Sequence, residues 1–160
     1  EMKLKKIEDS LYLCAWPISE ISTLYANVKE HSYIEVSKEK PLMEVLDISA
    51  LDIYIGGVYN DAAVLNINLF GISLICDMRN NSISCGYAKG PLSIKKDQFQ
   101  LRIIVDKNSI EIFIDEGEFL LSGEVNCDYI LNYMKITSNI PVSVEKIKIA
   151  SLKNQSKVRI

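Results

Sequence analysis

The amino-acid sequence predicts an all-β protein built as an antiparallel β-sandwich. Apolar and polar residues alternate with a period of two through many short segments, which is the pattern of half-buried strands. Polar, Gly-containing or Pro-containing breaks separate these segments, and no sustained helical period occurs. With 160 residues, 48% of them hydrophobic, the chain is long enough to bury one continuous core. We therefore expect a single domain over 1–160, of the jelly-roll or concanavalin A-like kind.

The chain opens with a predicted hairpin that leads into a short helical turn. Residues 1–6 and 11–16 both alternate, and residues 7–10, IEDS, would form the turn of the hairpin. Pro17 suits the first position of a helical turn, because a first helical residue leaves its N–H unbonded in any case. The apolar residues that would share one face of this turn are Ile18, Ile21 and Leu24.

From Tyr25 onward the sequence is a series of short alternating segments. In the last of them the alternation changes phase between Val144 and Ile147, which predicts a β-bulge. The polar and basic tail, residues 153–160, is expected to fray. Apart from the stretch 101–125, the predicted strands lie within residues 32–37, 42–49, 51–57, 62–71, 72–79, 82–88, 133–138 and 142–152.

The clearest part of the pattern is a three-stranded antiparallel meander. Apolar residues occupy every second position in 101–105 and again in 110–114, and residues 106–109 read as the turn between them. A second break precedes the third strand, which we place in residues 119–125. Gly117 in this break is the residue best placed to adopt a positive φ, because it has no Cβ to clash.

Composition excludes several classes of partner. A formal net charge of −3 and a pI near 5.3 give no basic surface for nucleic acid or for an anionic membrane. No apolar run approaches the length of a transmembrane helix, and the first residues lack the apolar core of a signal peptide. We therefore expect a cytoplasmic protein without nucleic-acid or membrane partners.

The four cysteines do not suggest a metal site. They are irregularly spaced without a Cys-x-x-Cys pair, and His31 is the single histidine, so we expect no metal and no cofactor. Cys76 lies within a strand-like run and is predicted to be a small buried hydrophobic residue. The alternative is a disulfide between Cys76 and Cys85 across a hairpin.

Residues 106–113, DKNSIEIF, and 115–118, DEGE, carry a family resemblance. They resemble the signature Asp-basic-x-Ser-Val/Ile-Glu-Val/Ile-Phe followed by Asn/Asp-x-Gly-Glu in the C-terminal β-sandwich of family 32 glycoside hydrolases, the invertases, sucrose-6-phosphate hydrolases, levanases and inulinases. Residues 75–77 and the following turn partly resemble a hairpin of the same domain, with Cys76 in place of the usual Tyr. The signature positions, to which we assign structural roles, are Asp106, Ser109, Glu111, Phe113, Gly117 and Glu118.

The N-terminal part agrees with this resemblance. Residues 1–4, EMKL, resemble the end of the strand that closes the catalytic propeller of the family, and residues 13–24 resemble the segment that leads into the sandwich. The resemblance therefore implies that 1–24 lie at a seam with a catalytic propeller that this chain does not contain. Trp16 is bulky and apolar at a chain reversal, which favours a contact surface; the alternative is that it packs into the core. The predicted seam residues are Trp16, Pro17, Glu20 and Leu24.

No catalytic residue is predicted on this chain. Glycoside hydrolysis needs two converging carboxylates, and the resemblance places them in propeller motifs, Asn-Asp-Pro, Arg-Asp-Pro and Glu-Cys, none of which occurs here. Asp106 and Glu111 fit turn and solvent-facing positions beside a hairpin instead. We do not expect the chain alone to be an enzyme.

Three functional hypotheses remain. The first is a non-catalytic module of a sucrose- or fructan-processing hydrolase that supports the propeller of the same polypeptide and contributes to contacts in a homo-oligomer. The second is a lectin-like carbohydrate-binding module, by analogy with other sandwiches. The third is a structural or interaction domain without a ligand. The aromatic residues that could stack on a sugar, unless they pack in the core, are Trp16, Tyr54, Tyr59, Tyr87 and Tyr129.

Overall fold

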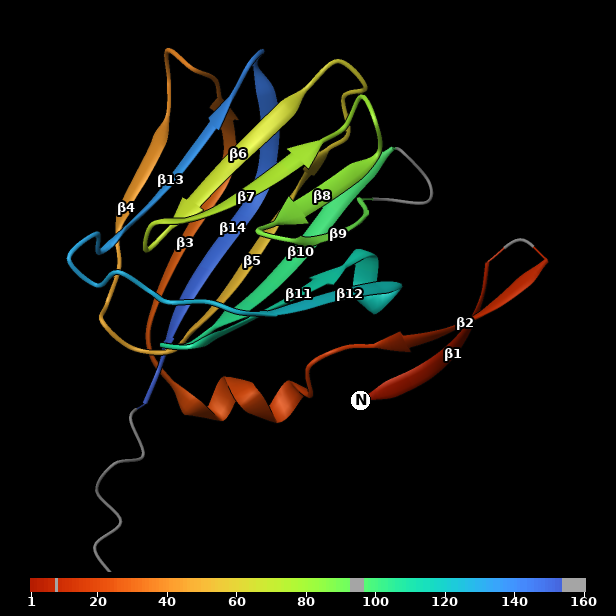
Figure 1. Cartoon of the computed structure of the whole chain (residues 1–160), viewed down its shortest axis with the longest axis horizontal. Coiled ribbons are helices and arrows are strands. Elements are labelled where there is room, and N and C mark those ends of the chain that lie inside the picture. The colour runs from red at the N-terminus through yellow and green to blue at the C-terminus, as the bar shows by residue number, and fades with distance from the viewer. Residues whose placement is uncertain (8, 93–96, 154–160) are drawn as a thin grey trace, which may run out of the picture.

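Two six-stranded antiparallel sheets lie face to face in the computed structural model, which describes residues 1–7, 9–92 and 97–153 (Figure 1). The first sheet contains, in spatial order, β12 (Phe119–Glu124), β11 (Ser109–Ile114), β10 (Gln98–Val105), β5 (Leu51–Val58), β14 (Val142–Leu152) and β3 (Tyr25–Val36). The second contains β4 (Leu42–Val45), β13 (Tyr133–Ser138), β6 (Val64–Leu69), β7 (Ile72–Asp77), β8 (Ser82–Cys85) and β9 (Ala88–Pro91). This arrangement confirms the predicted all-β sandwich. The predicted frayed tail falls, apart from Lys153, outside the described residues.

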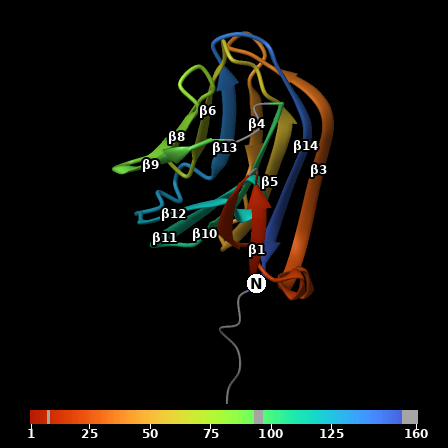
Figure 2. The same cartoon turned by 90° about the vertical axis from the view of Figure 1, so that its right-hand side faces the viewer.

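The core fills the space between the two sheets, which Figure 2 shows from the side. Every second residue of a strand points inward, so that Ile53 of β5, Ile103 of β10 and Ile67 of β6 are fully buried. A shift of one residue in strand pairing would turn such a set outward into water, and the core therefore fixes the register. The opposite side of the first sheet, which we call its outer face, carries the alternate residues of the same strands.

The N-terminal segment contains a hairpin and a helical turn, as predicted. β1 (Met2–Ile7) pairs with β2 (Ser10–Ala15), and the 3₁₀ helix η1 (Ser19–Leu24) follows. The helix begins two residues later than predicted, because Ile18 is still extended, with φ −62° and ψ 150°. No helix among the described residues is long and apolar enough to span a membrane.

Strand β3 begins at Tyr25, seven residues before the predicted strand. It lies at the edge of the first sheet and pairs on one side alone, with β14, so most of its first residues are exposed and do not alternate. The predicted bulge in β14 is confirmed, since its register against β5 shifts between Val144 and Lys146. The sequence pattern thus identified the buried strands better than the exposed one.

All four cysteines are buried and free. Cys76 of β7 lies opposite Ile83 of β8, so it does not face Cys85 across the hairpin. Burial raises the pKa of the Cys76 thiol to about 12. Cys76 is therefore the buried hydrophobic residue that was predicted, and the alternative disulfide is wrong.

The predicted meander is formed by β10, β11 and β12. Asp106 closes its first turn, because its carboxylate accepts hydrogen bonds from the backbone N–H groups of Asn108 (2.9 Å) and Ser109 (2.8 Å) and from the Ser109 hydroxyl (3.1 Å). These bonds, the one from Asn108 first, lower the pKa of Asp106. Glu111 is exposed on the outer face of β11.

The second turn of the meander is η2 (Asp115–Gly117), and its backbone is left-handed throughout. Asp115, Glu116 and Gly117 have φ values of 45°, 58° and 84°, which confirms the positive φ predicted for Gly117. A Cβ atom on Gly117 would lie 1.9 Å from the carbonyl oxygen of Ala15. Glycine is therefore needed here both for its backbone conformation and for the close approach of the N-terminal hairpin.

We predict that Gly117→Ala destabilises the protein more than Gly86→Ala does. Both glycines have positive φ, but a Cβ on Gly86 would meet no atom within 4 Å. Gly86→Ala should lower the free energy of unfolding by about 1 kcal/mol, the cost of a left-handed alanine. Gly117→Ala should cost about 1–3 kcal/mol more, because it also clashes with Ala15. Denaturant unfolding of both variants measures the difference, and equal values would contradict the close approach.

Candidate functional site

The N-terminal hairpin projects from the sandwich (Figure 1) and exposes an apolar face. Leu4 lies opposite Leu13 in the pairing of β1 with β2, Met2 lies opposite Ala15, and Leu11 lies opposite Lys6, so these side chains share one face. We call Met2, Leu4, Leu11 and Leu13 the open hairpin face; their exposed fractions are 70%, 73%, 72% and 61%. A group of exposed apolar side chains of this kind usually marks an interaction surface.

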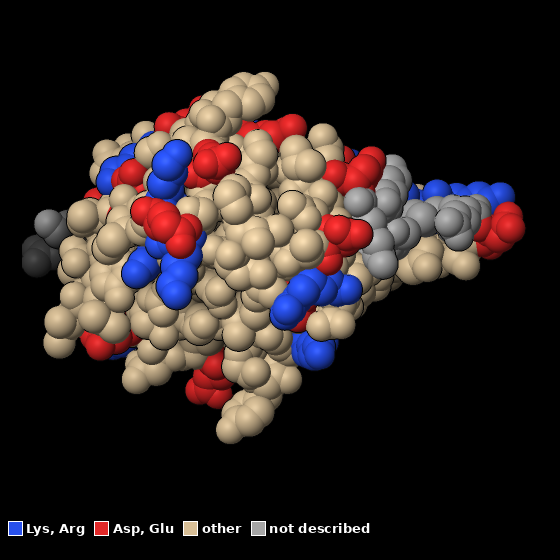
Figure 3. All heavy atoms as spheres, turned by 90° about the horizontal axis from the view of Figure 1, so that it is seen from above, with Lys and Arg blue, Asp and Glu red and all other residues tan. Residues whose placement is uncertain are grey.

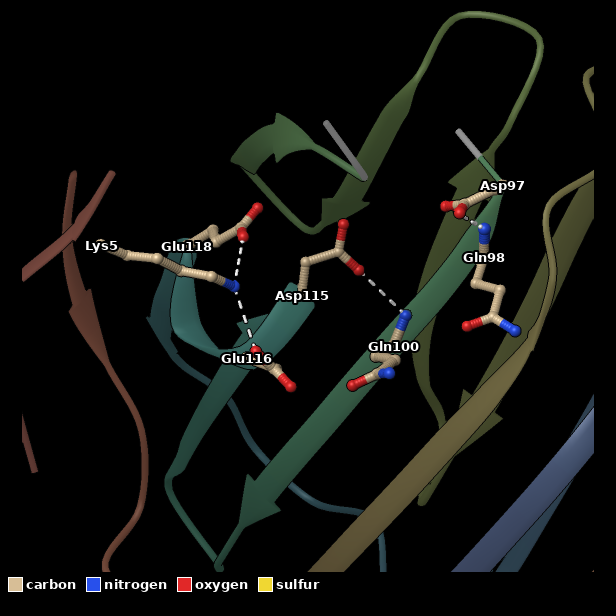
Figure 4. Close-up of a pocket in the computed structure, with 7 residues that line it drawn as sticks. All are labelled: Lys5, Asp97, Gln98, Gln100, Asp115, Glu116 and Glu118. Atoms are coloured by element: carbon tan, nitrogen blue, oxygen red, sulfur yellow. Dashed lines mark hydrogen bonds and ion pairs between the residues drawn. The ribbon is translucent and has the colours of Figure 1, made fainter. Parts of the chain in front are cut away.

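The other face of the hairpin is fixed to the sandwich by an ion-pair cluster. Lys5 donates hydrogen bonds from Nζ to Glu118 Oε1 (2.7 Å) and Glu116 Oε2 (3.0 Å), and Figure 4 shows its side chain reaching from the hairpin toward both. The Glu118 side chain is 4% exposed, whereas that of Glu116 is 65% exposed. Lys5 therefore ties the hairpin to the η2 turn.

The charge of Lys5 is well matched to this position. The hydrogen bond to Glu118 is the largest influence on its pKa, and together with Glu116 it raises that pKa above the ordinary value of 10.5. A raised folded pKa means that the contribution to stability is complete below about pH 10.5 and is lost only as the pH rises through the folded value. Lys5 therefore keeps its charge throughout the physiological range.

Trp16, at the end of the hairpin, packs on the outer face of the first sheet. Its ring meets that of Phe113 edge-on, with centroids 6.1 Å apart, and the guanidinium carbon of Arg102 lies 5.5 Å from its centroid. Trp16 is half-buried and does not enter the core between the sheets. The backbone carbonyl of Pro17, the residue after Trp16, accepts a hydrogen bond from Arg102 (3.4 Å) and is thereby held on the same face of the sheet.

Arg102 is itself held by a buried carboxylate on the neighbouring strand β5. Its Nε and one terminal nitrogen donate to the two oxygens of Asp52, at 3.0 and 2.7 Å. Tyr25 Oη donates to the same carboxylate at 2.8 Å. Neither residue of this pair was predicted as a site residue. The sequence did contain a signal for the pair, because the strongly apolar strands β5 and β10 each carry a charged residue at an outward-facing position.

The predicted residues thus do not form a single site. Trp16, Pro17, Phe113, Gly117 and Glu118 gather at the base of the hairpin, where Asp115 also accepts a hydrogen bond from the N–H of Gln100 (3.1 Å, Figure 4). Asp106 and Ser109 lie at the other end of the meander. Glu20 is exposed in η1, and Leu24 is half-buried, with its carbonyl bonded to the N–H of Lys153.

The five aromatic candidates for sugar stacking do not form one surface. Tyr59 is buried, and Tyr129 packs edge-on against core residue Phe70, with centroids 5.1 Å apart. Tyr87 stands alone and fully exposed after β8. Trp16 and Tyr54, in contrast, line the same open cavity of about 390 Å³ on the outer face of the first sheet.

Charge and metal-ligand chemistry point to no further site. Acidic and basic side chains are interspersed on the surface seen in Figure 3 and do not gather in one basic patch. Within 1–7, 9–92 and 97–153, no group of three or more His, Cys, Asp or Glu side chains is arranged to hold a metal ion.

Comparisons with solved structures find the same fold in larger proteins. Exo-inulinase from Aspergillus awamori matches with a TM-score of 0.74 and 14% identity over 94% of this chain and 34% of its own. The β-fructofuranosidase from Schwanniomyces occidentalis matches with a TM-score of 0.70 and 16% identity, over 96% of this chain and 39% of its own. The sucrose-6-phosphate hydrolase from Lactobacillus gasseri matches with a TM-score of 0.66 and 14% identity, over 95% of this chain and 32% of its own. This chain thus spans only about a third to two fifths of the length of these proteins.

No curated protein sequence matches this chain. The family model described as "Glycosyl hydrolases family 32 C terminal" matches residues 72–151, half of the chain. This segment runs from β7 to β14 and includes the whole meander with its signature turn. The chain therefore belongs to the C-terminal β-sandwich domains of glycoside hydrolase family 32.

Proposed function

We propose that the chain is a non-catalytic β-sandwich module that supports the catalytic propeller of a sucrose- or fructan-processing hydrolase. The open hairpin face is the observation that carries this proposal. Leaving four large apolar side chains in water forgoes about 1.5–3 kcal/mol of burial for each. The resemblance of residues 1–4 to the last propeller strand makes the propeller the occupant that we propose for this face.

The way in which the hairpin is held supports the same function. A two-stranded hairpin is marginally stable alone in water, so its orientation depends on what anchors it. Lys5 and Trp16 anchor one side, through Glu118 and Phe113, and leave the open hairpin face turned away from these contacts. The sandwich would thus present a preformed surface on which a second domain packs.

The carboxylates near the hairpin are poor candidates for catalysis. Asp52 is buried and already accepts three hydrogen bonds, from Arg102 and Tyr25. Glu116 and Glu118 share the ammonium group of Lys5. A general acid or nucleophile must instead be able to reach a substrate bond. We infer that the chemistry belongs to the propeller.

The open hairpin face can be tested in the full-length gene product. The double variant Leu4→Asp and Leu13→Lys, whose opposite charges avoid repulsion between these paired positions, should lower its thermal stability, with a loss of at least about 2 kcal/mol, because two charged side chains would be buried at the seam. The same double variant should leave the melting temperature of the 160-residue chain nearly unchanged. Ile130→Asp, at a residue that is 89% exposed elsewhere, is the matched control. A full-length double variant as stable as this control would contradict the proposed seam.

The anchoring of the hairpin can be tested with two neighbouring glutamates. Glu118→Gln should destabilise the chain by about 1–3 kcal/mol, because it weakens a nearly buried ion pair. It should also make Trp16, the single tryptophan, easier to quench with iodide. Glu116→Gln removes the exposed contact of the same lysine and should cost at most about 1 kcal/mol. Equal effects of the two variants would show that Glu118 is not the main anchor.

The chain by itself should release no fructose from sucrose, levan or inulin. The reason is that none of its carboxylates lies in a motif that would pair an acid with a nucleophile. Assays of reducing sugar with purified chain measure this directly. Fructose release that disappears when a residue of this chain is substituted would overturn the assignment.

A further inference from the structure

We propose that the outer face of the first sheet carries a binding site for a neutral saccharide, with Tyr54 as its floor. The site is the open cavity of about 390 Å³ that Trp16 and Tyr54 line, and this volume falls within the range of roughly 300–1,000 Å³ typical of small-molecule sites. The proposal does not rest on the seam with a propeller, since the side chains that we expect to contact the sugar, Tyr54, Lys146 and Lys148, belong to the sheet itself.

Strand register brings the floor and walls of this cavity together. Tyr54 of β5 lies directly opposite Arg102 of β10 on one side and Lys148 of β14 on the other. Lys146, two residues before Lys148, lies opposite Gly56 and lines the same cavity. An aromatic ring is therefore flanked by cationic side chains from both neighbouring strands.

Gly56 allows the Tyr54 ring to lie along the sheet. A Cβ atom on Gly56 would come within 2.8 Å of the Tyr54 hydroxyl oxygen and 3.2 Å of two ring carbons. The Tyr54 ring thus covers the position that the side chain of any residue other than glycine at position 56 would occupy. A ring that lies along a sheet offers an extended aromatic surface, and its negative face attracts the partly positive C–H groups of a sugar ring.

Hydrogen-bond donors stand at the rim of this surface. Lys146 is exposed and has no hydrogen-bond or ion-pair partner among the described residues. Lys148 makes only a long contact with Glu30, at 3.9 Å, and lies 4.9 Å from the centroid of the Tyr25 ring. Lys146 is therefore available to donate to hydroxyl oxygens of a sugar stacked on Tyr54, and Lys148 can do so in exchange for its long contact with Glu30.

The balance of charge favours a neutral ligand over an anion. Arg102 is neutralised by its two-point contact with Asp52, and Lys148 faces Glu30. Burial raises the pKa of the Tyr54 hydroxyl, and the negative charges of Glu116, Glu145 and Asp115 raise it further. These carboxylates, with Asp52 and Glu30, offset part of the positive charge of Arg102, Lys146 and Lys148, so we expect the cavity to favour a neutral ligand.

The test is a titration of the 160-residue chain with 1-kestose, a neutral fructose-containing oligosaccharide. Trp16 borders the cavity and is the single tryptophan, so its fluorescence reports binding directly. We expect a saturable change with millimolar affinity. Tyr54→Ala should weaken binding at least about tenfold, whereas Tyr54→Phe, which keeps the ring, should change it less than about threefold. Tyr87→Ala, at an exposed tyrosine that does not line the cavity, should have no effect.

Two further arms make the result decisive. Lys146→Ala should weaken binding about threefold or more without loss of stability, because the residue is exposed. Inorganic phosphate should neither change the fluorescence nor compete with 1-kestose. An absence of saturable binding, binding that is equally tight in Tyr54→Ala, or displacement by phosphate would each overturn the proposal. None of these outcomes bears on the stability test of the open hairpin face.

Discussion

The ion pair between Asp52 and Arg102 determines how the first part of the chain meets the sandwich. Removing two charges from water is costly, so such a pair persists only where further hydrogen bonds complete it. Here Tyr25 donates to Asp52 and the carbonyl of Pro17 accepts from Arg102, and both residues belong to the segment that follows the hairpin. We infer that the pair serves mainly to position this segment, because its net contribution to stability is small by this reasoning.

The orientation of the hairpin is set by its contacts with this ion pair and with the η2 turn. Trp16 rests on Arg102 and Phe113 at one point, and Lys5 reaches Glu118 at another. Two separate contacts fix the direction in which the hairpin points, whereas a single contact would let the hairpin rotate about it. Between them, the missing side chain of Gly117 lets the backbone at Ala15 approach the turn. The signature turn of the meander is therefore a support for the hairpin, and this explains why it needs glycine followed by an acidic residue.

Sequence alone predicted the fold because alternation is a local property that buried strands cannot avoid. It failed for the first half of β3, where an exposed edge strand has no buried face to impose a pattern. It identified Gly117 from turn chemistry, which is also local. The contact of Gly117 with Ala15 and the pairing of Asp52 with Arg102 join residues far apart in the chain. Such contacts depend on the register between non-adjacent segments, which no short window of sequence contains.

Trp16 connects the two surfaces that we assign to this domain. It lines the saccharide cavity on the outer face and also a second cavity beside the hairpin that Leu4 helps to form. A sugar that shifts the indole must therefore change the free energy of the base of the hairpin. By thermodynamic linkage, a domain docked on the open hairpin face would change sugar affinity by the same factor by which sugar changes docking. The position of the Trp16 side chain thus couples the saccharide cavity to the open hairpin face. The size of this coupling depends on how differently Trp16 packs with and without bound sugar.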